Sequence, residues 1–241
     1  MREISDGSIN WQESLWRYFK VGRFRWTLQN SRLYFAASSQ FTDRFEGATA
    51  VLPPDFPVDP RFQRMEGSER AFFALRKLMK ISCWHREEYE SDAMWKLYAE
   101  QSKGVAICTT ADRMRTAIKP FRLQPAYGIE DLWAGAVSYH DLMTARLRPL
   151  GKTIYFSKHR AFSWEKEFRL LISLEMASEF VPDVPAGGIE VPVDLDALID
   201  HIMLGPELSV EDRDRIIASS REAGLGDRVR KSSLLGQPRF I

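Results

Sequence analysis

The feature that most constrains the fold is an irregular alternation of short apolar runs with longer amphipathic segments. The short runs are typical of strands and cover 33–36, 81–84, 105–108, 136–139, 189–191 and 202–204. Polar capping residues open helices near 68–80, 92–103 and 209–223, and Gly104 is expected to stop the second as a left-handed residue. Because there is no regular strand–helix–strand cadence and no GxGxxG or GxxxxGK loop, we expect an α+β fold with a mainly antiparallel or split sheet and flanking helices.

Length and charge narrow the class of protein further. The 241 residues suffice for a single globular domain over 1–241, and 34 Lys and Arg residues nearly balance 33 Asp and Glu residues. A net charge of +1 gives no global field that would attract nucleic acid or an anionic membrane. No signal sequence or membrane-spanning run is visible, so we predict a cytoplasmic protein without a membrane partner. Four prolines in 52–60 predict a mobile surface loop over 50–67.

The two cysteines, Cys83 and Cys108, have no histidine at a spacing typical of metal ligands. The four histidines are scattered, and none shows the spacing of a helical ligand pair. The sequence therefore predicts two reduced, mostly buried thiols and no metal site.

The clearest alternation of apolar and charged residues covers 162–174 and carries two glutamates, Glu165 and Glu167. On one strand these carboxylates would share a face and lie about 6–7 Å apart. Like charges that close raise the pKa of one group and create an acid or base, or both stay ionised and stabilise a cationic intermediate. A carboxylate beneath the ribose of NAD would stabilise the oxocarbenium-like state that forms when nicotinamide leaves. The competing interpretation is a solvent-exposed strand face with Glu167 and Arg169 in ordinary cross-strand pairs.

An early aromatic and basic segment offers further candidates. Arg17, on an aromatic-rich strand, could bind a pyrophosphate through its guanidinium, or could simply stack on its aromatic neighbours. Ser38 and Ser39 follow the strand at 33–36, where a hydroxyl could orient a catalytic glutamate or a ribose, or could serve only the turn. The basic and aromatic residues of 16–26 also suit stacking on nucleic-acid bases, although one edge of an ordinary sheet would have the same pattern.

Several segments together resemble a bacterial family known only as domain of unknown function 2971. They are Leu33-Tyr34-Phe35, Phe41-Thr42-Asp43-Arg44-Phe45-Glu46, Met94-Trp95 with Tyr98-Ala99, Lys103-Gly104-Val105, Ser157-Lys158 and Trp164-Glu165-Lys166-Glu167-Phe168-Arg169. The resemblance covers about 15–215. It departs from the family at Thr42-Asp43-Arg44, where the family usually reads Asn-Asp-Pro.

The order of an early Arg, a Ser at a strand and a Glu-x-Glu pair is similar to the Arg-Ser-Glu group of ADP-ribosyltransferases. That resemblance implies an ADP-ribosyltransferase-like fold, with Glu167 as the catalytic residue and Glu165 as the residue that positions the acceptor. It implies that NAD is a substrate held by Arg17, Ser38, Ser39 and Tyr34, and that no metal is needed. We therefore expect an NAD-dependent ADP-ribosyltransferase, a toxin or phage-defence effector, acting on a protein or nucleic-acid acceptor. The alternative is a non-enzymatic module that binds nucleic acid or protein through 16–26.

Overall fold

The computed structural model describes residues 1–3, 9–43, 45–49, 51, 66–145, 147, 151–180 and 183–239, with side chains from residue 70 onward in the helix that begins at Glu66. The chain divides into two compact units, each assembled from three segments. The first contains Met1–Ile9, Tyr34–Cys83 and Pro120–Glu190, and the second contains Asn10–Leu33, Trp84–Lys119 and Val191–Ile241. The predicted single domain over 1–241 stays a prediction. The predicted loop over 50–67 lies outside the described residues, except for Val51 and the start of the helix at Glu66.

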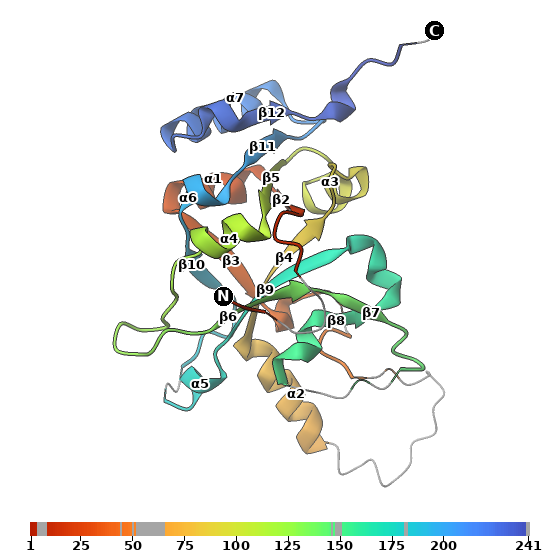
Figure 1. Ribbon diagram of the computed structural model, residues 1–241, viewed down its shortest axis with the longest axis vertical. Coiled ribbons are helices and arrows are strands. Elements are labelled where there is room, and N and C mark those ends of the chain that lie inside the picture. Colours follow the sequence, from red (N-terminus) through yellow and green to blue (C-terminus); the bar gives the residue numbers. More distant parts are fainter. Residues whose placement is uncertain are drawn as a thin grey trace. The chain divides into compact units, whose positions relative to one another are not determined.

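In the first unit, the sheet strands lie in the order β1 (Arg2–Glu3), β6 (Leu132–Ala136), β9 (Glu167–Ser173) and β4 (Met79–Arg86). β6 and β9 are antiparallel, and β3 (Arg32–Ala37) pairs antiparallel with the start of β4. A separate parallel pair consists of β7 (Ser138–His140) and β8 (Ser157–His159). The helical segments are η1 (Ser38–Gln40), α2 (Glu66–Leu78), η3 (Gly151–Phe156), η4 (Arg160–Glu165) and α5 (Glu175–Ser178) (Figure 1).

In the second unit, the end of β4 is followed by β2 (Ser14–Phe19), β5 (Val105–Thr110), β11 (His201–Leu204) and β12 (Val229–Lys231). These neighbours are antiparallel except β11 and β12, which are parallel. The helices are α1 (Val21–Asn30), α3 (Asp92–Tyr98), α4 (Ala111–Ala117), α6 (Leu195–Leu198), α7 (Val210–Glu222), η5 (Gly226–Arg228) and η6 (Ser233–Leu235). α1 packs against α7, and β10 (Ile189–Pro192) is one of three strands, with β3 and β4, in which the chain passes from one unit into the other.

The fold class agrees with the prediction from the sequence. The α+β class and the mainly antiparallel sheet are confirmed, with parallel pairs at β1–β6, β7–β8 and β11–β12. Two of the three expected caps are found, because the hydroxyls of Ser91 and Ser209 accept hydrogen bonds from the backbone amides of Met94 and Asp212. The helix expected to open at Ser68 begins at Glu66 instead. None of the helices in the described part of the chain is both long and apolar enough to cross a bilayer.

Each unit has its own core of residues from strands and from the helices that cover them. In the first unit the core cluster contains Met79, Ile81, Ile154, Tyr155, Phe156 and Leu171. In the second it contains Trp16, Tyr18, Met94, Trp95, Ala99, Ala106 and Cys108. Trp95 packs edge-to-face on Tyr18, so the apolar face of α3 is held against β2.

The prediction that the 16–26 segment forms one sheet edge is wrong. β2 ends at Phe19 and pairs on one side with β4 and on the other with β5, so it is an internal strand. The chain then turns at Lys20 and forms helix α1, because its apolar positions Phe24 and Leu28 repeat at helical spacing and face inward. The basic and aromatic residues of this segment therefore do not form one continuous strip along a strand.

The predicted left-handed stop at Gly104 is also wrong. The positive φ angles after α3 belong to Glu100, Gln101 and Ser102, at 50°, 56° and 72°. Gly104 is required for a different reason, since a Cβ atom there would lie 2.1 Å from the carbonyl oxygen of Phe19. The glycine allows β2 and the start of β5 to approach each other closely.

Replacing Gly104 with alanine is therefore expected to lower the free energy of unfolding by about 1–3 kcal/mol, because the new methyl group displaces backbone rather than a flexible side chain. Gly22 in α1 is the matched control, since a Cβ atom there meets nothing within 4 Å. Gly22→Ala should leave stability unchanged or raise it by about 0.5–1 kcal/mol, because alanine favours a helix. Urea unfolding of both variants measures the difference, and equal effects would refute the steric explanation.

Candidate functional site

The two candidate glutamates lie at the junction of η4 and β9 in the first unit. Glu165 is the last residue of η4 and Glu167 is the first residue of β9. Between them Lys166 adopts a left-handed conformation with φ of 43°. The expectation that both glutamates share one face of a continuous strand is therefore wrong, because Glu165 belongs to a 3-10 helix and the left-handed Lys166 separates it from the strand. The turn nevertheless brings both carboxylates to the same ammonium group.

That ammonium group belongs to Lys158 in β8. Its Nζ atom forms an ion pair with Glu165 Oε2 and lies 2.6 Å from Glu167 Oε1. The second oxygen of Glu167, Oε2, lies 2.6 Å from Nε of Arg169. The side chains of Lys158, Glu165 and Glu167 are only 7–8 % exposed. The competing interpretation of a solvent-exposed strand face is wrong, because every residue of β9 is buried.

Arg169 connects this pair to a third carboxylate. Its Nη1 and Nη2 atoms donate to Glu46 Oε1 and Oε2 at 2.6 and 2.9 Å, and neither side chain is exposed. Nη1 also donates to the carbonyl oxygen of Tyr155 at 2.5 Å. One edge of the guanidinium is thus bonded to Glu46 and the other to Glu167. Arg169 and Lys158 together fix the orientation of Glu167, because each binds one of its two oxygens.

The surroundings drive the pKa values of the two neighbouring glutamates apart. Burial raises the pKa of Glu165 to about 7, and the adjacent Glu167 adds to this rise while Lys158 opposes it. Burial also acts to raise the pKa of Glu167, but Arg169 and Lys158 outweigh it and hold the pKa of that carboxyl well below its usual range. Burial raises the pKa of Glu46 as well. Near neutral pH, Glu167 is therefore an anion, and Glu165 exchanges a proton readily.

The number of charges in the cluster is consistent with one protonated and two ionised carboxylates. Three carboxylates, those of Glu46, Glu165 and Glu167, surround two cations, Lys158 and Arg169. One bound proton brings the cluster to neutrality, and burial penalises any other net charge. Such an arrangement can hold one carboxylate ionised beside a developing positive charge while the other takes up a proton.

Arg17, expected to bind a pyrophosphate, lies in β2 of the second unit. Its guanidinium carbon lies 5.2 Å from the ring centroid of Phe19 and 5.7 Å from that of Trp84. The stacking on aromatic neighbours that the sequence offered as the alternative is therefore present. Arg17 is only half-buried, and so part of its side chain remains accessible.

The remaining predicted residues lie together in the first unit, at the end of β3 and in η1. Tyr34 donates its hydroxyl to Gln40 Oε1 at 2.9 Å and accepts from the amide of Gly188 at 3.1 Å. Ser39 is exposed, whereas Ser38 is fully buried. Among the described residues the Ser38 hydroxyl has no hydrogen-bond partner, although its carbonyl oxygen accepts from Arg76 at 3.0 Å. A buried, unsatisfied hydroxyl is a group that a ligand could satisfy.

Sequence reasoning did not select Lys158, Arg169 or Glu46 as members of the site. Arg169 lies two residues after Glu167 in β9, whereas Lys158 comes from β8 and Glu46 from a turn more than 100 residues earlier, so only the fold brings these two to the site. A signal was nevertheless present, because all three fall inside the segments that carry the resemblance described above. A second cluster, Cys108 with Asp200 and His201, was missed for the same reason.

Comparisons with known proteins give little further guidance. No family model matches the chain, so membership of the family of unknown function 2971 stays a prediction, and the curated proteins contain no match. Among solved structures, DarT from Thermus sp. 2.9 in complex with NAD+ has 12 % identity and a TM-score of 0.41, covering 93 % of this chain and 96 % of its own. The same protein in complex with carba-NAD+ has 11 % identity and a TM-score of 0.35, with coverages of 91 % and 94 %. Similarity at this level carries no argument about function.

Proposed function

We propose that this protein is an NAD-dependent ADP-ribosyltransferase whose chemistry takes place at Glu165 and Glu167. The observation that supports this most strongly is the geometry of the two carboxylates: both contact Lys158 Nζ, and Glu167 is also bonded to Arg169 through its second oxygen. An ADP-ribosyl transfer needs a permanent anion beside the sugar and a group that accepts a proton from the attacking acceptor. The two neighbouring carboxylates meet these needs separately.

The proposed reaction begins with cleavage of the bond between nicotinamide and the ribose. The bonding electrons leave with nicotinamide, and the ribose acquires the positive charge of an oxocarbenium-like state. Glu167, which is ionised, stabilises this charge electrostatically. An acceptor oxygen or nitrogen then forms a bond to the same ribose carbon, and its proton passes to Glu165. Lys158 and Arg169 hold Glu167 in place throughout, because both of its oxygens are bonded to them.

The residues proposed to bind NAD are Arg17, Ser38, Ser39 and Tyr34. Arg17 would bind the pyrophosphate as a bidentate donor, a role for which guanidinium is better shaped than ammonium. The unsatisfied hydroxyl of Ser38 supports a bond to a polar group of the substrate. Tyr34 is held by Gln40 and Gly188 and would help to fix the position of η1, which carries both serines. The acceptor is a protein or a nucleic acid, and a toxin or phage-defence role fits this chemistry.

A non-enzymatic binding module that uses 16–26 has weaker support. Arg23 stacks over Trp26 at 5.6 Å from the ring centroid, and Arg25 donates to Ser219 Oγ at 3.2 Å. These arginines are thus engaged within the protein. If the module hypothesis were right, nucleic-acid binding would weaken with salt and fall when Arg23 and Arg25 are both changed to alanine.

The transferase proposal predicts a specific pH dependence of nicotinamide release from NAD. Only the ionised form of Glu165 accepts a proton, and its pKa is raised to about 7. The rate should therefore increase by about tenfold per pH unit below that pKa and level off above it. Nicotinamide is quantified by chromatography with water, protein or nucleic acid as acceptor.

The Glu165→Gln variant provides the comparison, because glutamine keeps the shape of the side chain and does not titrate. Its release rate should be low and should lack the rise through about pH 7. A wild-type rate that stays constant from about pH 5.5 to 8.5 would remove Glu165 as the proton acceptor. A failure to release nicotinamide under all conditions would contradict the proposed function itself.

A further inference from the structure

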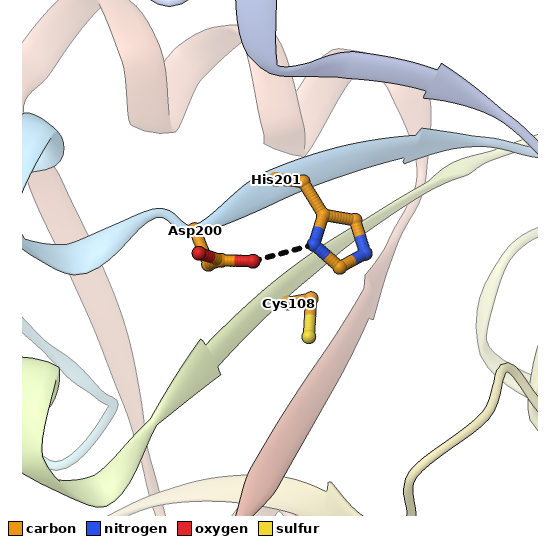
Figure 2. Close-up of side chains that lie close together, drawn as sticks. All are labelled: Cys108, Asp200 and His201. Atoms are coloured by element: carbon orange, nitrogen blue, oxygen red, sulfur yellow. Dashed lines mark hydrogen bonds and ion pairs between the residues drawn. The ribbon is translucent and has the colours of Figure 1, made fainter. Parts of the chain in front are cut away.

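A second cluster of chemically reactive side chains lies in the second unit, where β5 and β11 pair. Figure 2 shows Asp200 and His201 facing each other, with Cys108 on the neighbouring strand beside them. One potential ligand atom from each residue lies within 4.8 Å of the other two, and this is the one such group found among the residues that the structure describes. His201 Nδ1 lies 2.8 Å from Asp200 Oδ2. The cluster does not overlap with the residues proposed for ADP-ribosyl transfer.

Strand pairing explains why these residues meet. His201 and Cys108 are directly opposite each other in the antiparallel pair of β11 and β5, and Cys108 is opposite Trp16 in β2. Residues opposite each other in neighbouring strands point to the same face. The rings of Trp16 and His201 meet edge-to-face with centroids 5.3 Å apart, so the indole forms an apolar wall beside the imidazole.

The segment that carries Asp200 and His201 is fixed before any ligand binds. The amide of Asp200 donates to the carbonyl oxygen of Cys108 at 2.9 Å, which ties the two ligand-bearing strands together at the site. The carbonyl oxygen of Ile199 accepts from Arg113 Nη2 at 2.9 Å and from Arg228 Nη1 at 2.5 Å. Such outer contacts restrict the movement of ligand side chains and reduce the ordering cost of binding an ion.

We propose that Cys108, Asp200 and His201 form a zinc site with three protein ligands and a fourth position for water. Thiolate, imidazole and carboxylate are the ligands that zinc uses, and tetrahedral coordination places ligand atoms about 3.3–3.7 Å apart. The present spacing requires only small side-chain rotations. Cys108 is 4 % exposed whereas the side chain of Asp200 is 49 % exposed, so the carboxylate forms the solvent-facing side of the cluster and the thiol lies beneath it.

The ligand types of the cluster favour zinc over hard cations. Mg²⁺ and Ca²⁺ are bound by oxygen ligands, and only Asp200 offers oxygen here. A thiolate and a carboxylate together supply two negative charges, which balance the zinc ion and leave its complex neutral. The site should therefore select a soft, thiolate-binding metal.

Calorimetric titration of the full, metal-stripped chain with Zn²⁺ tests this proposal. We expect one zinc ion per chain, no binding of Mg²⁺, and affinity at least about 100-fold lower in the Cys108→Ser and His201→Gln variants. Cys83→Ser is the matched control, because Cys83 is the other free cysteine and lies in the first unit. Zinc binding by Cys108→Ser equal to that of the wild type would overturn the proposal, as would no binding by the wild type.

A second measurement uses only the wild type, so its result does not depend on whether the variants fold. When zinc is present at about ten times its dissociation constant, alkylation of Cys108 should slow by about tenfold, because only the unbound fraction reacts. The rate at Cys83 should not change. Equal rates at Cys108 with and without zinc would refute the site. Neither measurement uses NAD, so its outcome is independent of the proposed transferase activity.

Discussion

Replacing Arg169 with methionine is expected to lower the free energy of unfolding by about 3–5 kcal/mol, because two buried carboxylates lose their shared cation. Arg169 is completely buried and is bonded to both Glu46 and Glu167. Methionine occupies a similar volume, so the loss reflects charge rather than a cavity. Urea unfolding near neutral pH measures it. A loss below about 1 kcal/mol, typical of an exposed ion pair, would contradict the buried network.

A double substitution separates the ion pair from general disruption of the core. Glu46→Gln added to Arg169→Met removes the carboxylate that loses its ion pair in the first substitution, whereas Glu167 keeps its ion pair with Lys158. Part of the lost stability, at least about 1 kcal/mol, should return if the cost arises from uncompensated charge. If the two effects simply add, Glu46 and Arg169 do not depend on each other in the folded protein.

The helices and strands that the sequence predicts are those whose signals are local. The caps at Ser91 and Ser209 and the strand at 105–108 follow from adjacent residues, and the structure contains them. The left-handed conformation predicted for Gly104 was wrong because glycine occurs both in left-handed turns and at close backbone contacts. Its sequence context does not distinguish the two. The left-handed Lys166 gave no signal, since a lysine rarely adopts that conformation.

The candidate site shows the same division between local and long-range information. Glu165 and Glu167 stand out because they are close in sequence. Arg169 is close in sequence as well, but Lys158 and Glu46 join the cluster only through the return of the chain by β8 and η4 and through the long-range contact of Glu46 with Arg169. The pairing of β5 with β11 likewise creates the cluster of Cys108, Asp200 and His201, which no sequence spacing indicates. Long-range pairing of this kind depends on the whole fold.

The second large effect concerns catalysis at Glu167. Glutamine at this position keeps the size and hydrogen-bonding capacity of the side chain but removes the negative charge that we propose stabilises the ribose cation. The rate of nicotinamide release should fall by about 100- to 1,000-fold. Glu46→Gln is the matched control, because it also removes one buried carboxylate charge from the cluster, and it should keep the rate within about tenfold of the wild type.

The catalytic role of Glu167 is tested most directly by measuring nicotinamide release from NAD. The wild type, Glu167→Gln and Glu46→Gln are compared in equal amounts, after circular dichroism has verified that each protein is folded. Release by the wild type and by Glu46→Gln is expected, with near-complete loss in Glu167→Gln. Release by Glu167→Gln at the wild-type rate would contradict that role.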